Sequence, residues 1–183
     1  MKERIAVSFV FLVLFLKGAA SAQECGKANV SLAKPEYYVT TIGTFAVEPP
    51  SGWFHDDTRK NPFYFVKRGE NYNSAKTLMY VSVEPLEGTF DEAVQNDAKS
   101  YRQRCDRLVL QTLNSADLLE RGCRAVTQVF TCVRKKGSYI DLDTKFAING
   151  ILLNVVLSTD DRAEIEKYKA DYSYLLLHLA KVN

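Results

Sequence analysis

The chain has 183 residues, with 24 Lys or Arg and 22 Asp or Glu, so its formal net charge at neutral pH is +2. Nucleic-acid-binding proteins draw most of their affinity from clustered basic side chains, so a chain this balanced is not expected to bind nucleic acid. One local basic cluster lies mid-chain, and we interpret it as a solvated face because acidic residues lie among its members, Arg102, Arg104, Arg107, Arg121 and Arg124.

The first 22 residues have the three-part pattern of a secretory signal peptide. Lys2 and Arg4 precede an apolar run over residues 5–16, and the small residues 18–22 follow Lys17 and end in Ala-Ser-Ala. The apolar run is too short for a membrane-spanning helix, which needs about 20 residues. We therefore expect cleavage after Ala22 and a periplasmic or secreted protein with no stable membrane anchor.

The remaining residues, 23–183, have the size of one domain. Residues 23–36 are polar and contain Gly26 and Pro35, so we expect a flexible N-terminal arm followed by a single domain over 37–183. We expect this domain to be a monomer.

Strand patterns begin at residue 37. Residues 37–41 and 44–47 are rich in β-branched and aromatic side chains, which predicts a hairpin or one kinked strand. Residues 53–62 are predicted to form a loop, 63–67 a strand, 69–76 a polar loop and 78–83 another strand.

A capping box predicts where the first helix begins. The Thr89 hydroxyl can accept from the backbone near Glu92, whose carboxylate can reach back to Thr89. Apolar residues then recur at spacings of three and four, which places them on one helical face: Phe90, Val94, Ala98, Tyr101 and Cys105.

The second half of the chain predicts a meander and a closing helix. Strands are expected over 108–113, 124–133, 139–148 and 151–158, with a turn at 135–138 and a type I′ turn at Asn149-Gly150. A helix is expected over 161–180. The predicted fold class is α+β, an antiparallel sheet of about six or seven strands packed against two main helices.

Four cysteines follow the leader: Cys25, Cys105, Cys123 and Cys132. An even number in an exported chain predicts two disulfides. Cys123 and Cys132 on one strand would lie roughly 30 Å apart, which excludes that pair. A turn at 114–117 would bring Cys105 beside Cys123, so we favour Cys105–Cys123 with Cys25–Cys132; Cys25–Cys123 with Cys105–Cys132 remains open.

This element order resembles the PsbP-type fold family. The features are the strand 44–47 followed by Pro50-Ser51-Gly52-Trp53, the strand 78–83 leading to the capped helix, the meander and the terminal helix. The family includes an extrinsic photosystem II subunit, a eukaryotic Ran-binding transport factor and bacterial exported proteins, whose DcrB-like branch fits this chain best. The resemblance implies a binding or accessory module without catalysis, and it transfers no functional residue.

Four aromatic residues are candidates for partner binding. Trp53 and Phe54 follow a strand-ending Pro-Ser-Gly and could anchor a partner, although Trp53 in this position more often plugs the end of a core. Tyr72 lies in the polar loop 69–76, and Tyr174 lies on the outer face of the last helix.

Residues His55, Asp56 and Asp57 are the candidate metal ligands, with a solvated loop as the alternative because adjacent residues rarely converge on one ion. The sequence contains no nucleophile elbow, phosphate loop or His-Glu-x-x-His motif. We expect no catalytic residue and no cofactor, and an exported accessory domain that docks to an envelope or extracellular protein. The alternatives are a small-molecule or lipid carrier and a hydrolase dependent on His55.

Overall fold

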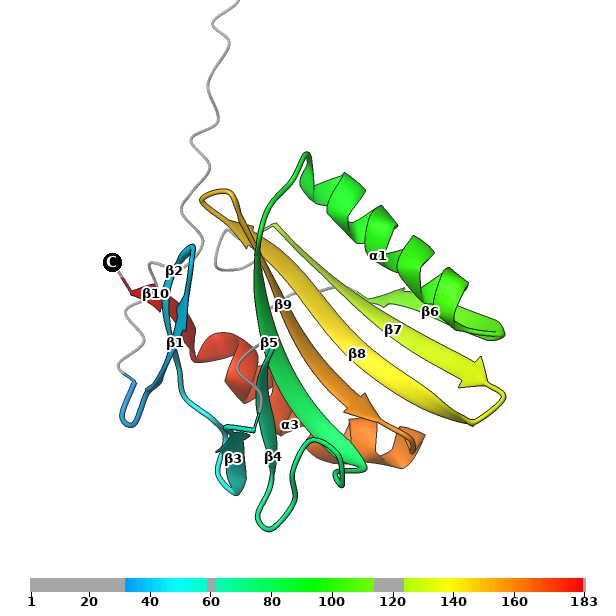
Figure 1. Cartoon of the computed structure of the whole chain (residues 1–183), viewed down its shortest axis with the longest axis horizontal. Coiled ribbons are helices and arrows are strands. Elements are labelled where there is room, and N and C mark those ends of the chain that lie inside the picture. The colour runs from blue at the N-terminus through cyan, green and yellow to red at the C-terminus, as the bar shows by residue number, and fades with distance from the viewer. Residues whose placement is uncertain (1–31, 59–61, 114–123, 183) are drawn as a thin grey trace, which may run out of the picture.

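A computed structural model describes residues 32–58, 62–113 and 124–182, which form two antiparallel sheets and two helices (Figure 1). One sheet has seven strands in the order β3-β4-β5-β9-β8-β7-β6, and the other has three in the order β1-β2-β10. The elements are β1 (Glu36–Thr40), β2 (Gly43–Val47), β3 (Trp53–Asp56), β4 (Phe63–Lys67), β5 (Thr77–Pro85), α1 (Phe90–Arg104), β6 (Arg107–Leu113), β7 (Ala125–Arg134), β8 (Gly137–Ile148), β9 (Ile151–Thr159), α3 (Arg162–Leu177) and β10 (Leu179–Val182).

The α+β fold and the meander are confirmed. Strands β6, β7, β8 and β9 pair antiparallel in chain order. Asn149 and Gly150 link β8 to β9 with φ angles of 49° and 76°, the two positive values that a type I′ turn requires.

Helix α1 begins at the predicted capping box. The Glu92 backbone N–H donates to the Thr89 hydroxyl over 3.2 Å, and the Thr89 N–H donates to the Glu92 carboxylate over 2.8 Å. These two bonds satisfy backbone groups that the first helical turn would otherwise leave exposed.

Two element predictions were wrong. We expected residues 53–62 to form a loop, but residues 53–56 form strand β3. This strand pairs with β4 at the edge of the seven-stranded sheet, where its aromatic side chains can pack. The last helix ends at Leu177 and not near residue 180, since residues 179–182 pair with the free edge of β2. Leu179 still reaches the core, now as a strand residue that is 9% exposed.

The larger core lies between α3 and one face of the seven-stranded sheet. Alternate residues of β8 and β9, such as Leu142 and Leu153, point into it, and Tyr172 and Leu175 of α3 cover them. The Tyr172 hydroxyl donates to Thr144 over 2.6 Å, which satisfies a polar group inside this core. The intervening residues of both strands therefore face the opposite side of the sheet.

Helix α1 covers only one end of that opposite side, over β6, β7 and β8 (Figure 1). Tyr101 of α1 stacks on Phe130 of β7 with ring centroids 3.9 Å apart. A disulfide joins Cys105, which caps α1, to Cys132 of β7, with Cα atoms 5.4 Å apart.

This disulfide corrects the favoured pairing. The prediction placed the β6–β7 turn at residues 114–117, but Arg107 pairs with Val133 and Leu113 with Thr127, so the hairpin is centred several residues later. Cys105 therefore lies beside Cys132 and does not pair with Cys123. The alternative pairing contains the observed bridge, and its other half, Cys25 with Cys123, lies outside the described residues.

Candidate functional site

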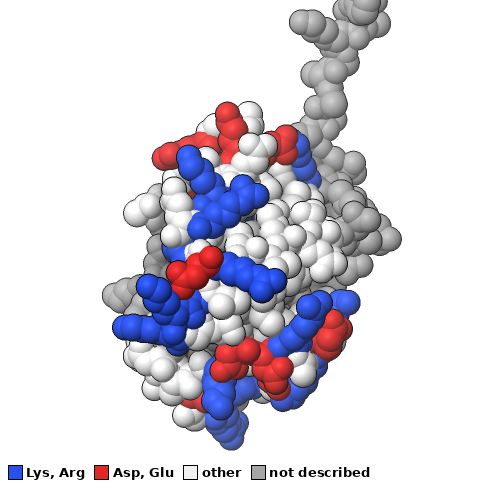
Figure 2. Space-filling model, turned by 90° about the vertical axis from the view of Figure 1, so that its right-hand side faces the viewer, with Lys and Arg blue, Asp and Glu red and all other residues white. Residues whose placement is uncertain are grey.

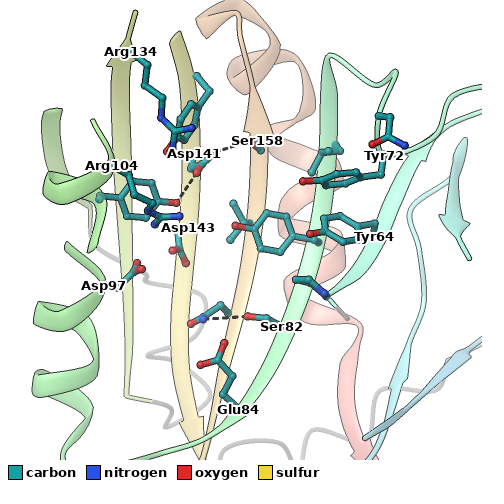
Figure 3. Close-up of a pocket in the computed structure, with 18 residues that line it drawn as sticks. Tyr64, Tyr72, Ser82, Glu84, Asp97, Arg104, Arg134, Asp141, Asp143 and Ser158 are labelled. Carbon is teal, nitrogen blue, oxygen red and sulfur yellow. Dashed lines mark hydrogen bonds between the residues drawn. The ribbon is translucent and has the colours of Figure 1, made fainter. Parts of the chain in front are cut away.

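A polar groove of about 680 Å³ occupies the part of the sheet that α1 leaves uncovered. Its floor is formed by β4, β5, β9 and β8, one wall by α1, and the other by the loop after β4 that carries Tyr72 (Figure 3). A volume of this size is typical of small-molecule sites. A smaller hollow of about 420 Å³ continues beneath α1 and shares Glu84, Asp97 and Asn154 with the groove.

Strand register arranges the floor in rows. Tyr64, Tyr80, Val156 and Asp143 are consecutive cross-strand neighbours and form the central row. Ser158 and Asp141 lie in the next row toward one end, and Asn154 and Lys145 in the next row toward the other. Because neighbouring strands lie about 4.8 Å apart, Tyr80 and Asp143 stand roughly 10 Å apart across Val156.

Asp141 is held by two hydroxyl groups. Ser158 donates to one carboxylate oxygen over 2.5 Å, and Tyr101 donates to the other over 2.5 Å. Burial raises the pKa of Asp141 and outweighs the opposing effect of these two hydrogen bonds. Both of its oxygens are therefore already engaged.

Asp97, Asp143 and Lys145 form the ion cluster of the site. The Lys145 ammonium, on a side chain that is 2% exposed, contacts Asp97 over 2.7 Å and also donates to Asp143. Burial raises the pKa of Asp143 against the opposing effect of Lys145. Burial alone would lower the pKa of Lys145, but Asp143 and Asp97 offset this and the pKa is raised. One cation thus serves two carboxylates.

Three tyrosines line the side of the groove opposite α1. The Tyr64 ring lies 4.6 Å from the Tyr72 ring and 5.5 Å from the Tyr80 ring, measured between centroids. Burial, followed by the charges of Asp141 and Asp143, raises the pKa of Tyr80 well above its ordinary value, so its hydroxyl remains a hydrogen-bond donor. Within the described residues this hydroxyl has no hydrogen-bond partner.

Solved structures match this chain over most of its length. Cyanobacterial PsbP (CyanoP) from Synechocystis is 16% identical with a TM-score of 0.52, covering 84% of this chain and 96% of its own. The Ran-binding protein Mog1p of Saccharomyces cerevisiae is 9% identical with a TM-score of 0.53, covering 82% and 96%. LpqN of Mycobacterium tuberculosis, involved in cell envelope biogenesis, is 9% identical with a TM-score of 0.54, covering 82% and 90%.

The chain has the PsbP-like fold. No family model matches the sequence, and no curated protein matches it significantly. At these identities the likeness concerns the fold of the PsbP-like domain alone, so the DcrB-like branch remains a prediction.

The candidate aromatics of the PsbP-like domain lie in three separate places. Trp53 is 2% exposed, and its ring nitrogen donates to Asp171 over 2.7 Å, so it closes the end of the core and offers no free surface. Phe54, the next residue, is 39% exposed. Tyr174 stacks on His178 with ring centroids 3.7 Å apart, far along α3. Among these candidates only Tyr72 lines the groove.

The structure does not bring the candidate metal ligands together. His55 and Asp56 alternate along β3; the His55 ring packs on Phe63 at 3.9 Å, whereas Asp56 accepts from the backbone N–H of Tyr72 over 2.5 Å. Asp57 is exposed after the strand. Across residues 32–58, 62–113 and 124–182, no group of three or more His, Cys, Asp or Glu side chains could hold a metal ion.

Three of the five arginines of the basic cluster fit its interpretation as a solvated face, whereas Arg104 lines the groove. Figure 2 looks at the side of the molecule that lies at the right of Figure 1, and Lys and Arg there alternate with Asp and Glu. Arg102 and Arg107 are exposed, and Arg124 pairs with Asp91 over 2.5 Å. Arg121 lies outside the described residues.

The sequence analysis missed most of the groove, although one signal was present. Residues 140–146 alternate apolar with charged or polar side chains: Asp141, Asp143 and Lys145 occupy every second position of a strand predicted to lie inside a meander. A strand with neighbours on both sides that carries charges at every second position predicts that one face of the sheet is polar and not covered by a core. In the part of the chain that the structure describes, no helix is long and apolar enough to cross a membrane.

Proposed function

We propose that this PsbP-like domain is an exported binding module without catalysis of its own, which holds a polar ligand in the groove. The observation that carries the proposal is a set of unmatched polar atoms. The Oδ1 atoms of Asp143 and Asn154 are buried without a hydrogen-bond partner in the described structure, and the Tyr80 hydroxyl lines the same groove. Buried polar atoms in proteins are nearly always hydrogen-bonded, so these three suit a polar ligand.

The compartment is part of the proposal. The leader pattern supports export, and the Cys105–Cys132 disulfide is compatible with an oxidising space outside the cytoplasm. The involvement of LpqN in cell envelope biogenesis supports an accessory role at an envelope, where the loaded domain would dock to another protein.

Two rival functions fit the groove less well. A lipid carrier needs an apolar cavity, whereas this floor carries carboxylates and hydroxyls whose desolvation by an alkyl chain would be costly. A serine hydrolase of the usual kind needs a histidine base beside its nucleophile, and no histidine among the described residues lines the groove, which contains Ser82 and Ser158. His55, the candidate base, packs against Phe63 of the larger core and does not line the groove.

A binding screen with defined probes tests the proposal. Amino acids, short peptides, sugars, phosphorylated metabolites and fatty acids would each be added to the purified protein in a thermal-shift assay. A polar probe at 100 times its Kd should raise Tm by roughly 5–10 °C. Tyr80→Phe removes only the unpartnered hydroxyl and should weaken that probe several-fold, whereas Tyr37→Phe, exposed on the other sheet, should not.

Two results would contradict the proposal. One is that no polar probe shifts Tm, and the other is that both tyrosine variants bind the stabilising probe as the wild type does. A shift with fatty acids alone would favour the lipid carrier instead.

A further inference from the structure

Arg104 and Arg134 lie at one end of the groove, each over the ring of a different tyrosine (Figure 3). Arg104 is the last residue of α1, and its guanidinium carbon lies 4.6 Å from the centroid of the Tyr101 ring. Arg134 is the last residue of β7; its guanidinium carbon lies 4.8 Å from the Tyr139 ring and it donates to the Tyr139 hydroxyl over 2.9 Å. Both guanidinium charges act on that hydroxyl.

Neither arginine has a carboxylate partner among the described residues. Arg124 shows the contrast, because it holds both oxygens of Asp91 over 2.5 and 2.6 Å. The nearest acid in the groove, Asp141, already accepts from two hydroxyls. Burial raises the pKa of Asp141 and the charge of Arg104 still acts to lower it, but neither Arg104 nor Arg134 forms an ion pair with a described carboxylate.

Tyr139 adds a donor to the same place. Burial, followed by the charge of Asp141, raises the pKa of its phenol, so the hydroxyl keeps its proton at neutral pH. That hydroxyl accepts from Arg134, and its own hydrogen has no acceptor among the described contacts. Arg104, Arg134 and Tyr139 thus place three sets of hydrogen-bond donors at this end of the groove, and the nearby Asp141 carboxylate is already occupied by Ser158 and Tyr101.

The disulfide fixes the two arginines relative to each other. Cys105 directly follows Arg104, and Cys132 lies two residues before Arg134. The Asp106 N–H also donates to the Val133 carbonyl over 2.9 Å, which closes the end of α1 onto β7. The disulfide therefore holds the backbone positions that carry Arg104 and Arg134 close together.

We propose that Arg104, Arg134 and Tyr139 form an anion subsite that binds the carboxylate or phosphate group of the groove's ligand. Guanidinium groups recognise both anions through paired N–H donors. The proposal rests on the proposed function, which it sharpens to ligands that carry an oxyanion at one end.

The geometry of β8 sets the size of such a ligand. Tyr139 and Asp143 lie on the same face four residues apart, which corresponds to about 13 Å of strand. An oxyanion bound at Tyr139 leaves this length for the remainder of the ligand, enough for about four extended residues of a peptide. The far end carries Glu84 and Asp97, so it suits a neutral or cationic group (Figure 3).

NMR titration of the ¹⁵N-labelled protein with inorganic phosphate alone, and separately with acetate alone, tests the subsite. We expect saturable shifts of the Arg104 and Arg134 side-chain N–H signals and of the Tyr139 backbone. Arg104→Gln and Arg134→Gln should each weaken phosphate about tenfold, the size expected of one charge-assisted hydrogen bond. The double variant Arg102→Gln/Arg107→Gln removes two positive charges, one more than either test variant, at exposed neighbouring positions and should leave the affinity unchanged.

Each outcome decides the proposal. An equal loss in the control variant would show a diffuse basic surface, and shifts that never saturate or that persist in both single variants would overturn the subsite. The stronger of the two probes identifies the anion type. Saturable phosphate or acetate binding with no groove ligand in the screen would support the subsite and contradict the proposed function. A groove ligand whose affinity is unchanged by Arg104→Gln and Arg134→Gln would support the proposed function and contradict the subsite.

Discussion

Replacing Lys145 by Met isolates the energetic role of the ion cluster. The side chain is 2% exposed, and its ammonium serves Asp97 and Asp143, which is itself 3% exposed. Met keeps the volume and removes the charge, so Asp143 would be left buried without a cation. Breaking a buried pair in this way costs about 3–5 kcal/mol, a large part of the roughly 5–15 kcal/mol that a domain has in total.

The loss should depend on pH with a definite sign. Burial already raises the pKa of Asp143, and removal of Lys145 raises it further. A carboxyl whose folded pKa exceeds its unfolded value favours folding at low pH and loses that contribution as pH rises through the folded pKa. The unfolded states of variant and wild type titrate alike, so the variant should lose up to about 1.4 kcal/mol per pH unit relative to wild type only above about pH 7, the pKa of Asp143 in the folded wild type.

Urea denaturation followed by far-UV circular dichroism at pH 5.5, 7 and 8.5 measures this. The matched control is Lys167→Met on α3, which removes an exposed lysine paired with Glu164 over 2.9 Å and should leave the free energy of unfolding nearly unchanged. The double variant Lys145→Met/Asp143→Asn should recover part of the loss at pH 8.5. Equal stability of Lys145→Met and the control, or a loss that does not vary with pH, would refute the reasoning.

Three further changes test local features. Cys105→Ser/Cys132→Ser removes a disulfide with a sequence separation of 27 and should lower the free energy of unfolding by about 3.5 kcal/mol by the loop-entropy relation. Non-reducing peptide mapping of the wild type should show Cys105 linked to Cys132. A Cys105–Cys123 peptide would contradict the structure. Thr89→Ala removes the cap of α1 and should lower the free energy of unfolding in urea by about 1 kcal/mol. An unchanged free energy of unfolding would show that the capping box does not stabilise the protein. Gly150→Ala should cost about 1–2 kcal/mol because its φ is 76°, and an unchanged midpoint would argue against the turn.

Local signals in the sequence were sufficient for most elements. The Thr89 capping box and the Asn149-Gly150 turn each depend on residues within a few positions of one another, and both appear as expected. Strand β10 could not be foreseen in this way, because Leu179 follows a helical pattern and becomes a strand only through the distant edge of β2. The hairpin centre between β6 and β7 is likewise set by tertiary pairing, and this misled the cysteine assignment.

The groove was hidden for a related reason. Tyr80, Asp143 and Arg104 come from β5, β8 and α1, and nothing in their spacing along the chain shows that they line one hollow. The alternating charges of β8 predict that one sheet face is polar, but the sequence does not show how little of that face α1 covers. Tyr72 was a candidate for its place in a loop, and the tertiary fold makes it part of the wall.

The ion cluster also separates a structural role from a binding role. Buried ion pairs can often be replaced by well-packed apolar residues with no loss of stability, or with a gain of about 1–4 kcal/mol. The triple variant Asp97→Ala/Asp143→Val/Lys145→Met removes all the charges at once, so it should be at least as stable as wild type in urea, unlike Lys145→Met alone. It should nevertheless lose the ligand found in the thermal-shift screen, because the unmatched Asp143 oxygen is gone. A triple variant that is several kcal/mol less stable would mean that the fold itself requires these charges, and the strongest physical reason for placing a ligand over them would disappear.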